Sequence, residues 1–157
     1  MNHCCCHSKD TLHSNLKTKN ISQDLKLLTD LNELKEGAKY PLLTCKNNDS
    51  EFTFLIDTGA DVSIINKGSL SQISHTEGEG KVHIMTGSTS VVASNCNIKL
   101  STKHFSSTEE FRVLDIGSQC FTLSTMAGTI IHGVLGMSFL IKNNLILDFK
   151  NNKIYQA

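Results

Sequence analysis

A carboxylate, a hydroxyl and a glycine follow one another at Asp57, Thr58 and Gly59, directly after an apolar run. Apolar side chains alternate along residues 52–56, which predicts a half-buried strand that ends at the carboxylate. An ionised aspartate at the buried end of a strand is costly unless it is hydrogen-bonded or has a chemical task. A carboxylate in this position can take up and release protons in general acid–base catalysis. A strand followed by an ordinary Asx turn is the alternative interpretation of the same residues.

Two separated stretches of the chain carry a family resemblance. Residues 55–63 resemble the active-site signature of retropepsin-like aspartic proteases. Far downstream, Val134-Leu135-Gly136 matches the two apolar residues and the glycine that open a short helix in that family. The matches extend over roughly residues 40–155, and the closing segment 145–149 is more similar to the ubiquitin-shuttle and bacterial members than to the viral ones. The resemblance implies an all-β, single-lobe, pepsin-like closed barrel with a flap hairpin and one short C-terminal helix.

The resemblance also implies hydrolysis of peptide bonds by two carboxylates that share one proton. One carboxylate takes a proton from water while the other protonates the carbonyl oxygen, and two like charges at close range cannot both ionise cheaply. The chain has one suitable aspartate, so the implied enzyme is a homodimer in which Asp57 faces its own copy across a two-fold axis. Its substrate would be a peptide or protein, with no cofactor and no metal. Asp115-Ile116-Gly117 is not a second motif, because it lacks the hydroxyl and follows too closely for a second lobe.

Family roles can be assigned to the residues that match. Thr58 would brace the paired loops, and Gly59 would allow their backbones to approach. The implied substrate-binding residues are Ala60, Asp61, Thr86, Gly87 and Ser88, and the implied structural loop beside the site is Val134, Leu135 and Gly136. Viral members carry an arginine after the downstream glycine, and it pairs with the residue matching Asp61, whereas Met137 stands there in this chain. The role of Asp61 is therefore open, and the departure favours the cellular or bacterial branch.

Two other functions are compatible with the same motif. A non-catalytic module on the same fold could bind peptides or a partner protein, and a β-rich interaction domain could carry the motif by chance. The intact carboxylate at Asp57 argues against the binding module, because a protein that only binds has no need for it. Loss of peptide cleavage in an Asp57→Asn variant would choose among the three.

The composition limits the partners that the protein can have. The chain has 157 residues, enough for one domain with a short appendage. Its 15 basic and 15 acidic residues balance, without a basic run, so neither nucleic acid nor an anionic membrane is expected as a partner. No apolar stretch of membrane-spanning length and no apolar signal core are present, which predicts a cytoplasmic protein. The 6 cysteines include an adjacent trio and predict reduced thiols.

Three sections are expected along the chain: a disordered tail at residues 1–20, a helix at 21–37 and the protease-like domain at 38–157. The histidines and cysteines of His3–His7 suggest a metal site, but five consecutive residues cannot place four donors around a zinc ion. No second pair of ligands follows nearby, so a disordered tail is the preferred interpretation. The helix is predicted from a cap at Ser22, an apolar stripe and a stop at Gly37. The stripe consists of Ile21, Leu25, Leu28 and Leu31.

Apolar alternation and turn residues predict the strands of the domain. A hairpin of residues 42–45 and 51–56 delivers the catalytic aspartate, and a second hairpin spans 82–93 with Gly87 at its tip. That second hairpin occupies the place of the family's flap in the chain order. Residues 66–81 are expected to form a loop with a helical turn at 69–73. Further strands are expected at 97–100, 110–114, 121–123, 145–149 and 153–155. His132 is expected to be a hydrogen-bonded structural histidine, and Asp115 a turn residue at a strand end.

Overall fold

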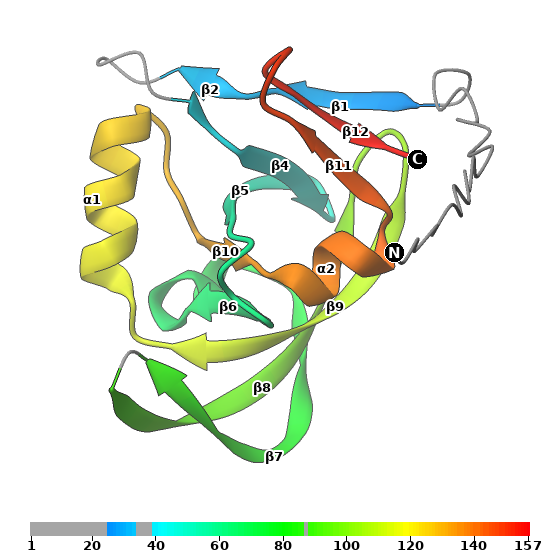
Figure 1. Ribbon diagram of the computed structural model, residues 1–157. Coiled ribbons are helices and arrows are strands. Elements are labelled where there is room, and N and C mark those ends of the chain that lie inside the picture. The colour runs from blue at the N-terminus through cyan, green and yellow to red at the C-terminus, as the bar shows by residue number, and fades with distance from the viewer. Residues whose placement is uncertain (1–24, 34–38, 87) are drawn as a thin grey trace, which may run out of the picture.

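The computed structural model describes residues 25–33, 39–86 and 88–157, and a seven-stranded sheet forms its body (Figure 1). The strands follow the order β4-β5-β10-β6-β9-β8-β7, and β4 also pairs with β8, so that the sheet closes into a barrel. They are β4 (Leu42–Asn47), β5 (Ser50–Ile56), β6 (Ser63–Asn66), β7 (His75–Thr86), β8 (Thr89–Ser101), β9 (Ser106–Leu114) and β10 (Gly133–Leu135). The predicted all-β, single-lobe barrel is confirmed as a mostly-β closed barrel with few helices. The predicted tail, with its histidine and cysteine run, lies outside the described residues.

A second, three-stranded sheet lies at the top of the molecule in Figure 1. It consists of β1 (Lys26–Asp30), β12 (Lys153–Gln156) and β11 (Leu145–Asp148) in that order, and the last two confirm the predicted closing strands. A two-stranded ladder of β2 (Asn32–Glu33) and β3 (Lys39–Tyr40) connects β1 to the barrel. The central strand of the three-stranded sheet is β12, which therefore has hydrogen-bonded neighbours on both sides.

The helix predicted for residues 21–37 is wrong for the part of it that the structure describes. Lys26–Asp30 and Asn32–Glu33 are strands, and β1 pairs antiparallel with β12. Between the two strands, the Leu31 N–H donates to the Asn152 carbonyl oxygen at 2.9 Å, and the Leu31 side chain enters the core. Pairing with a strand from the far end of the chain therefore outweighs the local helical pattern. The rest of the predicted helix lies outside the described residues.

Within the described part of the predicted protease-like domain, two α-helices are present where one was expected. The expected helix is α2 (Met137–Lys142), and the additional one is α1 (Gly117–Ala127), which includes the segment 121–123 that was wrongly predicted as a strand. Hydroxyl groups on α1 donate to carbonyl oxygens one turn earlier, and Gly128 ends the helix at φ +71°. A 3₁₀ helix at Lys67–Gln72 confirms the expected helical turn, but the loop predicted around it ends early because β7 begins at His75.

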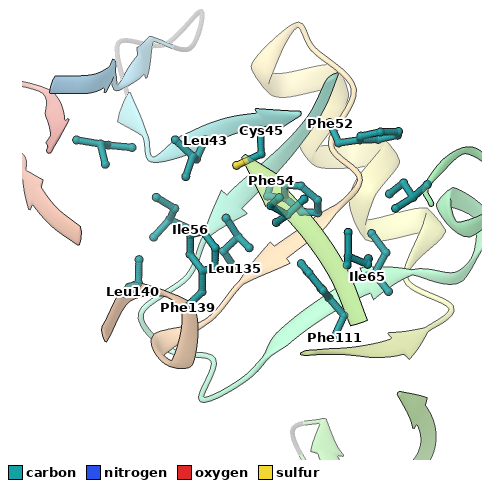
Figure 2. Packing of buried hydrophobic residues seen from close by; sticks show 14 of the residues in the cluster. Leu43, Cys45, Phe52, Phe54, Ile56, Ile65, Phe111, Leu135, Phe139 and Leu140 are labelled. Carbon is teal, nitrogen blue, oxygen red and sulfur yellow. The ribbon is translucent and has the colours of Figure 1, made fainter. Parts of the chain in front are cut away.

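The core fills the barrel with side chains from its strands and from α2. Phe54, Leu135 and Phe139 are fully buried and meet between the strands (Figure 2). Phe54 also packs on Phe111 of β9, with ring centroids 5.6 Å apart. The three cysteines of the described chain are free and buried, and burial raises the pKa of Cys45 to about 12. Among the described residues, no helix has the length and apolar character needed to cross a membrane.

The hairpin predicted for residues 82–93 is formed by β7 and β8, and its last described pair is Thr86 with Thr89. Pairing between β8 and β9 begins only at Ser94, so the outer part of the hairpin is a two-stranded ribbon. At its base, the register of β7 shifts between residues 77 and 81. Gly78 lies there against Asn95, where an added Cβ would come within 2.6 Å of the asparagine Cβ. The ribbon therefore extends from a closely packed base, and β7 and β8 lie at the bottom of Figure 1.

Candidate active site

Asp57 stands directly after β5, which lies between β4 and β10 in the barrel. Its backbone N–H donates to the Leu135 carbonyl oxygen at 3.0 Å and so continues the contact between β5 and β10. The carboxylate is half-buried, and its Oδ1 accepts the backbone N–H of Gly59 at 2.8 Å. The predicted strand that ends at a hydrogen-bonded carboxylate is therefore present.

The turn after the carboxylate is open to solvent on one side. Thr58 and Gly59 are exposed, and the Ala60 N–H donates to the Asp57 carbonyl oxygen at 3.2 Å. A Cβ added at Gly59 would lie 3.1 Å from Oδ1 of Asp57, so a side chain would crowd the carboxylate that the backbone holds. The turn thus presents one oriented carboxylate on an exposed loop.

The segment Val134-Leu135-Gly136 lies beside this loop, as predicted. Strand β10 is inserted between β5 and β6, parallel to the first and antiparallel to the second, so it passes between the two ends of the loop. A Cβ at Gly133 would come within 2.3 Å of the Ile64 carbonyl oxygen, and one at Gly136 within 2.5 Å of the Val62 oxygen. Both glycines are therefore required by close packing of backbone on backbone.

Backbone N–H groups at the start of α2 donate to carbonyl oxygens in the second half of the loop. The Met137 N–H donates to the Ala60 carbonyl oxygen at 2.8 Å, and the Ser138 N–H donates to the Asp61 oxygen at 3.1 Å. Met137 stands where viral members have an arginine, and the Asp61 carboxylate is exposed. In this chain the contact to Asp61 therefore runs through its backbone and requires no charged pair.

Sequence reasoning missed one residue near the loop, the buried Glu109 of β9. Its side chain accepts hydrogen bonds from the hydroxyls of Ser63 and Ser138, each at 2.9 Å. The signal was present in the strand pattern, because Glu109 is two residues before the inward-facing Phe111 and so shares its face of the strand. The glutamate was overlooked because a charged residue is rarely placed in a core.

Two other predicted assignments can be compared with the structure. His132 is a hydrogen-bonded structural histidine, as expected: the Thr53 N–H donates to its Nδ1 at 3.1 Å, and burial lowers its pKa. Its ring lies edge-on to Phe52, with centroids 5.0 Å apart. Asp115 follows β9 in an exposed turn before α1, which confirms the predicted turn residue. Its Oδ1 accepts the Gly117 N–H at 3.5 Å, a longer contact than that of Asp57.

The predicted substrate-binding residues fall in two places. Ala60 and Asp61 belong to the loop after Asp57, and Thr86 and Ser88 border the tip of the β7–β8 hairpin. Gly87 lies outside the described residues, and the binding roles of all five stay predictions. A cavity of about 600 Å³ lies elsewhere, between the 3₁₀ helix and α1. Within the described part of the chain, no cluster of three or more histidine, cysteine or acidic side chains could hold a metal ion.

Comparison with known proteins agrees with this geometry. The model of the aspartyl protease family matches residues 43–139, which include the loop, the hairpin and β10. Among solved structures, a retropepsin-like aspartic protease from Rickettsia conorii is similar with a TM-score of 0.53 at 16% identity, covering 85% of this chain and 92% of that one. The EIAV protease complexed with the inhibitor HBY-793 has a TM-score of 0.47 at 20% identity, covering 66% of this chain and 88% of that one. No curated protein matches the chain. The chain belongs to the aspartyl protease family, and its fold is that of the retropepsin-like members.

Proposed function

We propose that this protein is an aspartic endopeptidase whose catalytic pair consists of Asp57 from two copies of the chain. The observation that carries the proposal is the single oriented carboxylate, held by the Gly59 N–H in an exposed turn. Hydrolysis by this chemistry requires two carboxylates that share a proton, and the similar Asp115 turn leads directly into a helix. A second copy of the loop is the remaining source of the partner carboxylate.

In the proposed dimer, one Asp57 takes a proton from the attacking water while its copy protonates the carbonyl oxygen of the peptide bond. The apparent pKa values of such a pair belong to both carboxylates together. The exposure of Thr58 and Gly59 supports this assembly, since it leaves the turn accessible to a second turn of the same shape. A glycine there also permits the two backbones to approach each other.

The β7–β8 hairpin is proposed to act as the flap that covers a bound peptide. Within the described residues, its outer ribbon, which starts at the pair Val82–Ala93, has strand partners only inside the hairpin. A two-stranded ribbon with few neighbours opens at a low free-energy cost, which is the property that a lid over substrate requires. The predicted contacts of Thr86, Gly87 and Ser88 with substrate follow from this movement.

The three-stranded sheet of β1, β12 and β11, called the small sheet below, is proposed to extend across the two-fold axis. Strand β12 is already paired on both sides, so strand sharing has to use one of the outer strands, β1 or β11. Ile141 and Phe149 flank β11 and leave 68% and 61% of their surfaces exposed, which makes the β11 edge the preferred face. An isologous contact there would place the same residues on both sides of the axis.

Cleavage of a peptide library by the wild type, Asp57→Asn and Asp115→Asn tests the proposal. Asp115 is the matched control, because it is exposed and also accepts a glycine N–H two residues later. We expect cleavage by the wild type and by Asp115→Asn, and none by Asp57→Asn, which is nearly isosteric. Binding of peptides without cleavage by the wild type would instead favour the non-catalytic binding module.

A further inference from the structure

Glu109 is a charged residue in the interior of the barrel wall. Only 4% of its surface is exposed, although it lies in the middle of β9 between the exposed Thr108 and Glu110. Burial of a carboxylate is costly unless it is hydrogen-bonded or ion-paired. The proposed reaction does not use it, because it is distinct from the exposed loop that carries Asp57. Its role has to be sought in the groups that it contacts.

Three side chains from two separate elements converge on this carboxylate. Ser63, the first residue of β6, donates its hydroxyl to Oε1 at 2.9 Å. Ser138 of α2 donates to the same oxygen at 2.9 Å, and Lys142 places its Nζ 3.9 Å from Oε2. Ser138 and Lys142 are four residues apart and therefore share one face of α2. The Lys142 Nζ also donates to the Thr108 carbonyl oxygen, so α2 is fixed to β9 near both of its ends.

The same contacts reach the loop that carries the catalytic aspartate. Ser63 is the residue at which the loop ends and β6 begins, and its hydroxyl oxygen also accepts the Gly136 N–H at 3.2 Å. Ser138 donates its backbone N–H to the Asp61 carbonyl oxygen within the loop. One buried carboxylate therefore contacts both Ser63, where the loop ends, and Ser138, which holds the loop backbone two residues earlier at Asp61.

We propose that Glu109 is the positioning residue of the catalytic loop, and the inference rests on the proposed protease function. It fixes α2 and the start of β6 relative to each other, so that the loop from β5 into β6 holds Asp57 in one orientation. It supplies a brace on the side of the loop where Met137 replaces the arginine of viral members. The interaction requires an oxygen acceptor at Oε1, and the charge is secondary because Lys142 is half exposed and lies at 3.9 Å.

The test compares Glu109→Ala with Glu109→Gln in the full chain, with Glu110→Ala as the matched control on the exposed face of the same strand. The amide of glutamine keeps an oxygen that accepts both serine hydroxyls, whereas alanine removes it. We expect kcat/KM to fall by about 10- to 100-fold in Glu109→Ala, since small displacements of a catalytic group have effects of this size. Glu109→Gln is expected to stay within about 3-fold of the wild type, as is Glu110→Ala.

Amide hydrogen exchange supplies a readout that does not depend on activity. In Glu109→Ala, exchange is expected to accelerate in segments 57–63 and 136–138 while the core of β8 keeps its protection, and Glu109→Gln is expected to restore both segments. If Glu109→Ala does not fold, Ser138→Ala removes one donor at an exposed position and is expected to accelerate the same segments to a smaller extent.

Unchanged exchange in both segments, acceleration spread evenly over the whole chain, or failure of glutamine to restore protection would each overturn the proposal. Failure of the protease assignment is recognised separately, because Asp57→Asn would then cleave as the wild type does, or the wild type would not cleave at all. In either case the exchange experiment still decides whether Glu109 holds the loop.

Discussion

Gly136→Ala is the substitution for which the structure predicts the clearest combined loss of stability and activity. A Cβ at this position would lie 2.5 Å from the Val62 oxygen and 2.8 Å from the Ala60 oxygen, closer than real Cβ atoms approach. Both contacts are backbone carbonyls of the loop that carries Asp57, and they cannot rotate away as a flexible side chain could. Gly136 has φ −88°, a conformation open to alanine, so the effect comes from the contacts alone.

The size of the effect follows from these distances. The loop has to retreat by about 1 Å to restore ordinary contacts, which as overpacking should cost about 1–3 kcal/mol of unfolding free energy. In a chain of this size Tm falls by about 2–4 °C for each kcal/mol. The same displacement of the loop is expected to lower kcat/KM by about 100-fold.

Thermal denaturation followed by circular dichroism, together with peptide cleavage, measures both quantities. Gly68→Ala is the control, because the Cβ there would meet only the Asn66 side-chain amide at 3.4 Å. That variant is expected to match the wild type in both assays. A Gly136→Ala protein with wild-type Tm and wild-type cleavage would refute the argument that the loop is packed tightly against this glycine.

Three further predictions follow from the structure. Specific activity is expected to fall on dilution and on mixing with excess Asp57→Asn chains, since each copy supplies half of the pair; sedimentation run beside the assay checks this, and a concentration-independent rate would contradict it. Burial lowers the pKa of His132, so its neutral form is favoured in the folded protein and its full contribution to stability is present above the ordinary pKa of 6.5. The free energy of unfolding should therefore decrease as the pH falls below that value, and it should decrease less steeply in His132→Gln. Cys45 and Cys96, with pKa values raised to about 12 and about 11, should react with a disulfide reagent only as fast as the chain unfolds, measured after residues 4–6 are changed to serine.

Local patterns in the sequence were sufficient to predict the strands that pair with their neighbours along the chain. The hairpin that delivers Asp57 follows from apolar alternation around a polar turn, and its two strands pair with each other. The β7–β8 hairpin and the β11–β12 pair are of the same kind.

The sequence was insufficient where the deciding partner lies far along the chain. Residues 26–30 have a helical pattern of leucines, but they form a strand because β12 offers an edge for pairing. The helix α1 was missed because its phenylalanine and threonines favour strands. Its hydroxyl groups hydrogen-bond to backbone carbonyl oxygens one turn earlier, and such bonds leave no periodic pattern in the sequence. Glu109 was missed because its hydroxyl partners, Ser63 and Ser138, come from two distant segments.

The pairing of β1 with β12 also constrains the order in which the parts of the molecule can fold. Lys26 pairs with Gln156, so almost the entire described chain has to be made before this ladder can close. Contacts between such distant residues form late, because the entropy of closing the loop is lost before the contact is gained. During synthesis on the ribosome, residues 26–31 emerge before the barrel strands and stay unpaired until β12 has been made. We therefore expect this segment to be the one on which chaperones that bind extended apolar chain act for longest, and the small sheet to be the last part of the fold to be completed.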